Sequence, residues 1–353
     1  MKKQHEISLR QTDQVPVSEK LLVGVDIAKA EFAAGTVWQA QYQYQGKTAN
    51  TVEGCAAFAE ALETRKAEQG ATTIHLIIEP TGGYEVALVS EAYRRQWRVT
   101  LVNPLTVRHW QQGRGKRGKA DRLDTQMLTL FGADKNPPAQ PPTDEAAAQL
   151  DSLLRRQDDL QLLLRSEHNR HTQTALNPNT PKAVRESIER TLAALAQELA
   201  AIEQAIRQLF ADHVTLARQL KQLLTVPGIG AKSAPYLLAF FHRFKAKTNA
   251  TGTAKQIVAY TGLDPQPFES GSSVRQRPTI SKQGDAAIRS RLFLCALGGV
   301  RGRNRLQDTY TSLCARGKAK KLALIACARK ALVWAWSVFI QDTTFDPSRF
   351  VNA

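Results

Sequence analysis

Alternation and runs of apolar residues divide the first third of the chain into strands and helices. Five strands are predicted, at Leu21–Ile27, Glu31–Trp38, Ala40–Gln45, Thr73–Glu79 and Arg98–Asn103. Helices are predicted at Val52–Lys66, at Tyr84–Arg95 and from Asp121 onward. Three strands in a meander, followed by alternating helix and strand, predict one α/β domain over residues 21–135. Residues 1–20 carry no such pattern and are expected to form a tail.

A proline-rich linker at residues 136–143 separates this domain from a segment with a different period. The apolar positions beyond it are spaced alternately three and four apart, as in the a/d seam of a coiled coil. They are Leu192, Leu195, Leu199, Ile202, Ile206 and Leu209 on one arm, and Leu150, Leu153, Leu160 and Leu164 on the other. We therefore expect a helical hairpin over residues 144–220, with arms Asp144–Ala175 and Lys182–Leu220 and Thr180 as the N-cap of the second arm. Plain core helices are the alternative.

Residues 221–353 are expected to form a mainly helical C-terminal domain. It opens with LLTVPGIGAKSA, Leu223–Ala234, whose pattern is typical of a helix-hairpin-helix. Glycines in such a turn let backbone amides approach a DNA phosphate, so Gly228, Gly230 and the neighbouring Lys232 are candidate nucleic-acid contacts. A loop at Phe268–Pro278 and a basic helix from Ala286 follow.

Charge narrows the class of partner. The chain of 353 residues has 48 Lys and Arg against 32 Asp and Glu, a formal net charge of +16. The excess lies in three clusters, within 104–125, 270–305 and 316–330, while 143–223 is close to neutral. Nucleic acid is the expected partner of such a chain. Leu322–Ile340 is interrupted by Arg329 and Lys330, so no membrane span is expected, and four scattered cysteines fit a reducing cytoplasm, here a bacterial one with association to the nucleoid.

Four carboxylates stand at telling positions. Asp26 and Glu79 end two buried strands that should be neighbours in the sheet, and Asp121 and Asp124 share one helix face. Such a set can hold two divalent cations about 4 Å apart, which clamp the attacking and leaving oxygens of a phosphodiester. We expect Mg²⁺ there, with Mn²⁺ as a substitute. Capping of the helix by Asp121 and solvated strand ends are the structural alternatives.

The chain resembles the RuvC-like branch of the ribonuclease-H fold, and more closely the insertion-sequence one-ten transposases with their eleven-eleven subgroup and the related Piv-type DNA invertases. The resemblance rests on GVDIAKAEF, EPTGGYE, GKADRLDTQMLTLFG, LLTVPGIG, AYTGLDP and SGSSVRQRPTISKQGDAAIRSRL, which span most of the chain from Leu21 to about Leu297. It implies a DEDD transposase in which Asp26, Glu79, Asp121 and Asp124 match the metal-binding tetrad.

The resemblance also implies a serine nucleophile in the C-terminal domain, best matched by Ser270, with Ser272, Ser273 and Ser281 as rivals. It implies that a structured non-coding guide RNA chooses donor and target double-stranded DNA. It further implies a homo-oligomer, dimer to tetramer, in which the serine of one protomer meets the carboxylates of another. A phosphoserine would conserve the energy of the phosphodiester bond, so strands could be rejoined without ATP.

Basic residues near both elements are candidate phosphate contacts: Arg114, Lys116, Arg117 and Lys119 in the glycine-interleaved loop, and Arg275, Arg277, Lys282 and Arg289 around the serine. Three other functions stay open. They are a metal-dependent Holliday-junction endonuclease that uses water, a site-specific DNA invertase, and a non-catalytic nucleic-acid-binding protein dimerised by its hairpin.

Overall fold

The computed structural model describes residues 16–113, 121–270 and 274–350, with the backbone alone at 267–270, 274–278 and 350. The chain divides into two compact units, residues 1–142 with 246–249, and residues 143–245 with 250–353. Each unit has a hydrophobic core of its own.

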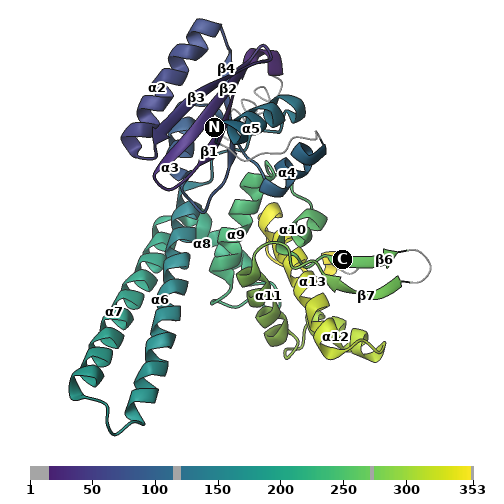
Figure 1. Ribbon diagram of the computed structural model, residues 1–353. Helices are drawn as coiled ribbons and strands as arrows, with labels where there is room; N and C mark the ends of the chain where they lie inside the picture. Colours follow the sequence, from purple (N-terminus) through teal and green to yellow (C-terminus); the bar gives the residue numbers. More distant parts are fainter. Residues whose placement is uncertain (1–15, 114–120, 271–273, 351–353) are drawn as a thin grey trace. The chain divides into compact units, whose positions relative to one another are not determined.

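The first unit is built on a five-stranded mixed sheet in the order β3-β2-β1-β4-β5 (Figure 1). The strands are β1 (Lys20–Ile27), β2 (Glu31–Trp38), β3 (Gln41–Ala49), β4 (Thr73–Glu79) and β5 (Arg98–Leu101), and a short 3-10 turn, η1 (Val17–Glu19), precedes them. β1 pairs with β2 antiparallel and with β4 parallel, so the predicted strands and the expected neighbours are confirmed. The mixed sheet is consistent with a RuvC-like α/β fold.

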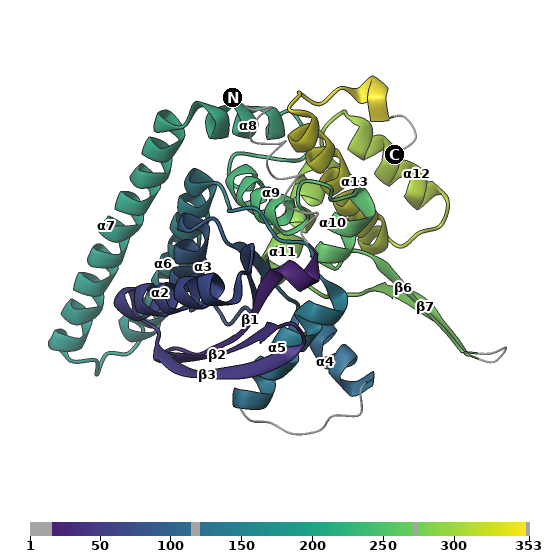
Figure 2. The same ribbon diagram turned by 90° about the horizontal axis from the view of Figure 1, so that it is seen from above.

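Helices cover both faces of the sheet (Figure 2). On one face, α2 (Val52–Gln69) and α3 (Val86–Arg94) pack on Val23, Val25 and the alternate side chains of β4. On the other, α4 (Pro104–Gly113) and α5 (Asp121–Lys135) pack on Ile77. Apolar side chains on both sides of a strand explain why β1 and β4 read as continuous hydrophobic runs.

Helix α4 was not predicted from the sequence. Its start carries a recognisable signal, since Pro104 occupies the first turn and the Asn103 side chain accepts a hydrogen bond from the Leu105 amide at 2.9 Å. Trp110 of this helix packs edge-on against Phe131 and donates its indole N–H to Asp134.

The second unit begins with the predicted helical hairpin, α6 (Glu145–Ala175) and α7 (Lys182–Asp212). The a/d positions of α7 are half-buried near the turn, and Ile206 and Leu209 at its base are buried in the core of the unit. Two details differ from the prediction. A break at His213 separates α7 from α8 (Val214–Leu223), and Pro181 rather than Thr180 stands at the N-cap of α7, where no side chain caps the helix.

The remaining helices are α9 (Ala234–Lys247), α10 (Ala254–Thr261), α11 (Ala286–Gly299), α12 (Arg305–Ala315) and α13 (Lys320–Gln341), with a 3-10 turn η2 (Pro347–Phe350). Helix α13 is long and apolar enough to cross a membrane by length and composition, but most of it is buried in this core, as Trp334 illustrates at 1% exposure. The segment expected to be a loop at Phe268–Pro278 is instead part of a hairpin, β6 (Pro265–Ser270) and β7 (Val274–Ile280).

Candidate active site

The carboxylates Asp26 and Glu79 lie opposite one another at the ends of β1 and β4. They are direct partners in the parallel register of the two strands, and both are partly exposed. Neighbouring strands run about 5 Å apart, so the register alone brings the two side chains to one place on the sheet edge.

The charge around Glu79 shows which other residues are near it. Burial raises the pKa of the Glu79 carboxyl, and the Asp26 and Asp124 carboxylates raise it further. The Arg108 guanidinium, on the exposed face of α4, acts against this rise. Three of the predicted acids therefore sense one another, and Arg108 joins them although sequence reasoning did not single it out.

Asp121 is engaged elsewhere. Its carboxylate forms an ion pair with Lys47 on β3 at 2.8 Å, and Lys47 also contacts Glu31 on β2 at 2.6 Å. The Lys47 ammonium lowers the pKa of the Asp121 carboxyl. Within the described part of the chain, no three His, Cys, Asp or Glu side chains are arranged as a ready set of metal ligands.

Helix α5 is held unusually close to the sheet, and this fixes where Asp121 and Asp124 begin it. A Cβ at Gly24 would lie 2.4 Å from Thr129 Oγ1 and 2.6 Å from the Thr125 carbonyl oxygen, so only glycine admits the helix there. The Tyr42 hydroxyl of β3 contacts Thr125 Oγ1 at 2.9 Å and the Arg122 carbonyl at 3.1 Å. Gly24 lies two residues before Asp26, and its lack of a side chain therefore serves the carboxylate cluster.

The turn after Glu79 is shaped by a second acidic residue. The Glu85 carboxylate accepts hydrogen bonds from the amides of Thr81 and Gly83, both at 3.1 Å. Gly82 and Gly83 have φ angles of 66° and 103°, which disfavour other residues. The EPTGGYE motif thus encodes one candidate ligand followed by the turn that orients it.

The structure describes the predicted serine only by its backbone. Ser270 is the last residue of β6 and pairs with Val274 of β7. Arg275 and Arg277 lie on β7, again with only their backbone described. Ser272 and Ser273 lie outside the described residues. The rival Ser281 donates its hydroxyl to the Asp264 carboxylate, and this contact helps to close the base of the hairpin.

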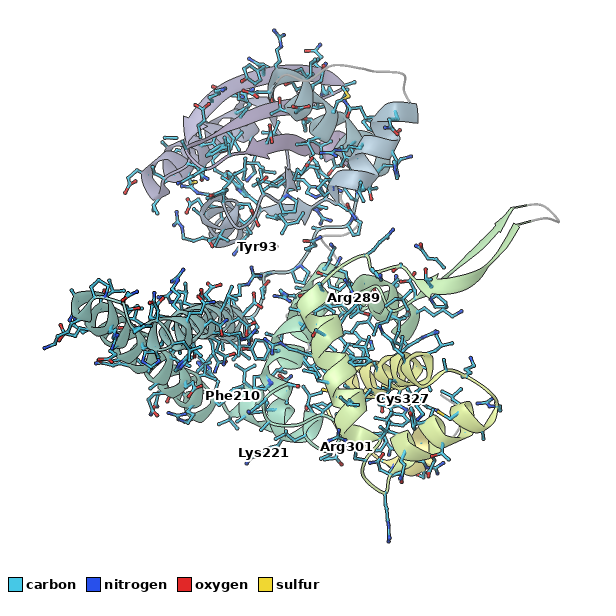
Figure 3. All side chains as sticks on the ribbon, turned by 60° about the horizontal axis from the view of Figure 1, so that its bottom comes forward. Tyr93, Phe210, Lys221, Arg289, Arg301 and Cys327 are labelled. Atoms are coloured by element: carbon cyan, nitrogen blue, oxygen red, sulfur yellow. The ribbon has the colours of Figure 1, made fainter. Side chains whose placement is uncertain are left out.

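Two of the conserved-looking motifs, AYTGLDP and ISKQGD, hold that base by direct backbone contact. A Cβ at Gly262 would lie 2.1 Å from the Gln283 carbonyl oxygen, and one at Gly284 would lie 2.1 Å from that of Tyr260. Lys282 adopts a left-handed φ of 56° beside them and is exposed. Arg289 donates Nη1 to the carbonyls of Thr261 and Gly284, both at 3.0 Å, so this predicted phosphate contact also braces the turn. Figure 3 shows Arg289 near the start of α11 and Arg301 beyond its other end.

The VPGIG turn lies between α8 and α9. Gly228 has a φ of 86°, and a Cβ there would lie 2.5 Å from the Cys295 carbonyl oxygen of α11, so this glycine serves internal packing. Gly230 and Lys232 are exposed and remain accessible. The predicted contacts Arg114, Lys116, Arg117 and Lys119 all lie outside the described residues. His242 is buried, with Nε2 2.9 Å from Gln219 Oε1, and burial lowers its pKa to about 4.

A mixed sheet with paired carboxylates at its edge, in a basic chain, defines a class of enzymes that act on nucleic acid. Residues 23–181 match the family profile described as a DEDD transposase of the IS110 type, and residues 220–311 match that described as the transposase IS116/IS110/IS902 family.

Two relatives align over 329 residues, which is 93% of this chain and 98% of their own length. They are the pilin gene-inverting proteins of Moraxella lacunata, 30% identical, and Moraxella bovis, 31% identical. The chain belongs to the IS110 family of transposases and is a DNA recombinase or transposase.

Proposed function

We propose that this enzyme cuts and rejoins DNA strands at the carboxylates Asp26, Glu79, Asp121 and Asp124, in a domain with the RuvC-like ribonuclease-H fold. The observation that carries the proposal is the β1–β4 register, which sets Asp26 opposite Glu79. The raised pKa of Glu79 supports it, because like charges kept together at a partly exposed edge are typical of a site built to receive a cation.

The four side chains offer only carboxylate oxygens, the donors that Mg²⁺ prefers and Mn²⁺ accepts. Bound ions, two to a site, would stabilise charge on the attacked phosphate and activate the attacking hydroxyl. Asp26, Glu79 and Asp124 are partly exposed and free to change rotamer on binding, whereas Asp121 must first exchange the Lys47 ammonium for the ion.

Ser270 is the proposed nucleophile. Its hydroxyl oxygen would form a bond to phosphorus while the bond from phosphorus to one strand oxygen breaks, and the serine proton would pass to that leaving oxygen through solvent. The phosphoserine keeps one ester bond for each one broken, so a hydroxyl of another strand can attack it and restore the phosphodiester. The buried and neutral His242 supplies no base for this step, which leaves activation of the serine to the carboxylate site.

The remaining parts of the proposal concern partners. A structured guide RNA would select donor and target duplexes, and a dimer or tetramer would bring the serine of one protomer to the carboxylates of another. The VPGIG turn, as a helix-hairpin-helix, would offer Gly230 and Lys232 to a phosphate. Site-specific inversion is the second candidate function, favoured by the alignment with the gene-inverting proteins over nearly their whole length.

A denaturing gel tests the serine and the carboxylates separately. The purified protein is incubated with Mg²⁺, its flanking RNA and a labelled DNA junction. Wild type should give a protein–DNA adduct that survives denaturation, while Ser270→Ala should give none and Ser187→Ala, an exposed serine on the hairpin, should behave as wild type. Asp121→Asn should lose both adduct and cleavage but keep nucleic-acid binding.

The other outcomes are equally informative. Cleavage without an adduct in wild type would replace the serine by water and favour a junction endonuclease. An adduct that persists in Ser270→Ala but disappears in Ser272→Ala or Ser273→Ala would move the nucleophile along the same hairpin. Normal cleavage by Asp121→Asn would remove that residue from the metal site.

A further inference from the structure

A strongly basic surface lies on the last two long helices of the second unit. The α12–α13 surface, as we call it, comprises Arg301, Arg303, Arg305, Arg316, Lys318, Lys320, Lys321, Arg329 and Lys330, against which the same stretch holds only Asp308. All of these basic residues are exposed except Lys330, which is half-buried. In the part of the chain that the structure describes, none of them has a carboxylate partner, whereas Arg243 and Arg291 in the same unit are both paired.

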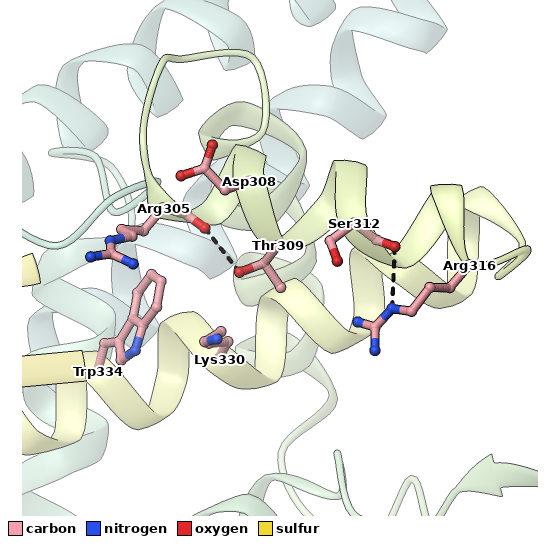
Figure 4. A pocket seen from close by; sticks show the side chains of 7 residues that line it. All are labelled: Arg305, Asp308, Thr309, Ser312, Arg316, Lys330 and Trp334. Carbon is pink, nitrogen blue, oxygen red and sulfur yellow. Dashed lines mark hydrogen bonds between the residues drawn. The ribbon is translucent and has the colours of Figure 1, made fainter. Parts of the chain in front are cut away.

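The surface is hollowed at α12. One cavity, of about 260 Å³, is lined by the cations Arg305, Arg316 and Lys330 together with the hydroxyl residues Thr309 and Ser312 (Figure 4). A second cavity, of about 650 Å³, shares Arg305 with the first and adds Arg303. Because they share lining residues, the two hollows adjoin along the first turns of α12.

The cations of the first cavity are held in place from below. Arg316 Nε donates to the Ser312 carbonyl at 3.3 Å, which fixes the guanidinium and leaves its Nη groups for another acceptor. The Lys330 ammonium lies 5.5 Å from the centre of the Trp334 ring. Two anchored cations and two hydroxyls around one hollow can hold a phosphate by charge-assisted hydrogen bonds.

The second cavity reaches the VPGIG segment. Thr225 and Pro227, just before and within that turn, line it opposite Arg303 and Arg305. A strand of nucleic acid that runs from the turn along α12 would therefore meet cations in both hollows. The neutral helical hairpin of the same unit, with ten basic and eleven acidic residues over 143–223, shows that the charge is localised.

We propose that the α12–α13 surface binds the sugar-phosphate backbone of a nucleic acid, with successive phosphates at the two hollows. Nine cations spread over two helices suit a polyanion better than a single small anion, whose charge one of the hollows would satisfy. The proposal rests on the proposed function in one respect only, that the enzyme handles DNA with an RNA partner. The carboxylate site and Ser270 play no part in it.

Fluorescence anisotropy of the full chain tests the surface without any cleavage. Two probes are titrated over a range of NaCl, a random-sequence 20-base-pair DNA duplex and a 20-nucleotide single-stranded RNA. The variant carries Arg303→Gln, Arg305→Gln and Arg316→Gln, and the matched control carries Arg156→Gln, Arg165→Gln and Arg190→Gln, three exposed arginines of the hairpin.

We expect the slope of log Kd against log salt to flatten by about 2 on the duplex, or by somewhat less on the RNA, because each lost phosphate contact removes about 0.9 or 0.7. Flattening on one probe alone would assign the surface to that nucleic acid, and flattening on both would make it a general backbone site. An unchanged slope on both probes, or an equal loss in the hairpin control, would overturn the proposal.

A charge-preserving variant guards against misfolding. Arg305→Lys with Arg316→Lys keeps both positive charges and should keep the wild-type slope, and thermal unfolding of all variants should match wild type because the side chains are exposed. Since no step of this test depends on strand cleavage, it stays readable if the denaturing-gel experiment on Ser270 fails.

Discussion

At the scale of single residues, two acids of the candidate site are treated in opposite ways by their surroundings. Glu79 is partly buried next to Asp26 and Asp124, which disfavours its charged form. Asp121 is exposed and neutralised by Lys47. Because the ionised form of Glu79 is disfavoured in the folded protein, its charge destabilises the metal-free fold near neutral pH. Functional sites often retain such strain.

Glu79→Gln should therefore raise the melting temperature of the metal-free protein, since the amide has the same shape and no charge. It should lower strand cleavage at least about 100-fold, because a metal ligand contributes several kcal/mol to the transition state. Differential scanning calorimetry in EDTA measures the first effect and the denaturing gel the second. Glu68→Gln, on the exposed face of α2, is the control and should change neither. A lower melting temperature for Glu79→Gln would contradict the argument.

At the scale of elements, the site depends on how closely α5 approaches the sheet. Glycine permits contact at two places: Gly24 of β1 faces the α5 backbone, and Gly132 of α5 faces Ile77 of β4, where a Cβ would lie 2.7 Å from Ile77 Cγ1. The helix cannot give way at one point without moving its first turn, which carries Asp121 and Asp124. Packing of one helix thus couples stability to the carboxylates.

Gly24→Ala should destabilise the protein by about 1–3 kcal/mol, the usual effect of overpacking, and should also reduce cleavage by displacing α5. Urea unfolding and the cleavage assay measure the two losses. Gly113→Ala is the matched control, because a Cβ at Gly113 meets nothing within 4 Å. Equal behaviour of the two variants would mean that the close approach at Gly24 is not required.

At the scale of the whole molecule, the hairpin and the C-terminal helices form one compact unit. Leu150, Leu154 and Leu209 of the hairpin belong to the same core as Phe240 of α9 and Trp334 of α13. A polar cluster strengthens this junction. Arg291 of α11 contacts both carboxylate oxygens of Asp158 on α6 at 2.6 Å, and its guanidinium stacks 3.3 Å from the ring centre of Tyr236 on α9.

A double-mutant cycle of Asp158→Asn and Arg291→Gln should give a coupling energy of about 1–2 kcal/mol, because the pair is partly buried and shares Tyr236. Urea unfolding of the four proteins measures it. The exposed pair Lys182 and Glu186, 3.5 Å apart on α7, should give less than about 0.5 kcal/mol. If both cycles gave the same coupling, the junction would owe its stability to apolar contacts alone.

The sequence by itself determined the five strands, the hairpin arms and the place of each tetrad carboxylate along its element. These follow from local periodicity, which depends only on neighbours in the chain. The parallel pairing of β1 with β4 was also predictable, because a meander followed by a crossover leaves few orders for the sheet.

Only the tertiary structure decided which distant groups meet those elements. Lys47 reaches Asp121 across 74 positions of sequence, Arg108 approaches Glu79 from a helix that periodicity missed, and Arg289 bonds two carbonyls of a turn instead of standing free. The β6–β7 hairpin escaped prediction as well, since its serines, glycine and arginines are typical of a loop. Charge and polarity have no period along the chain, so the partner of a charged side chain is fixed only when the backbone folds and brings the two together.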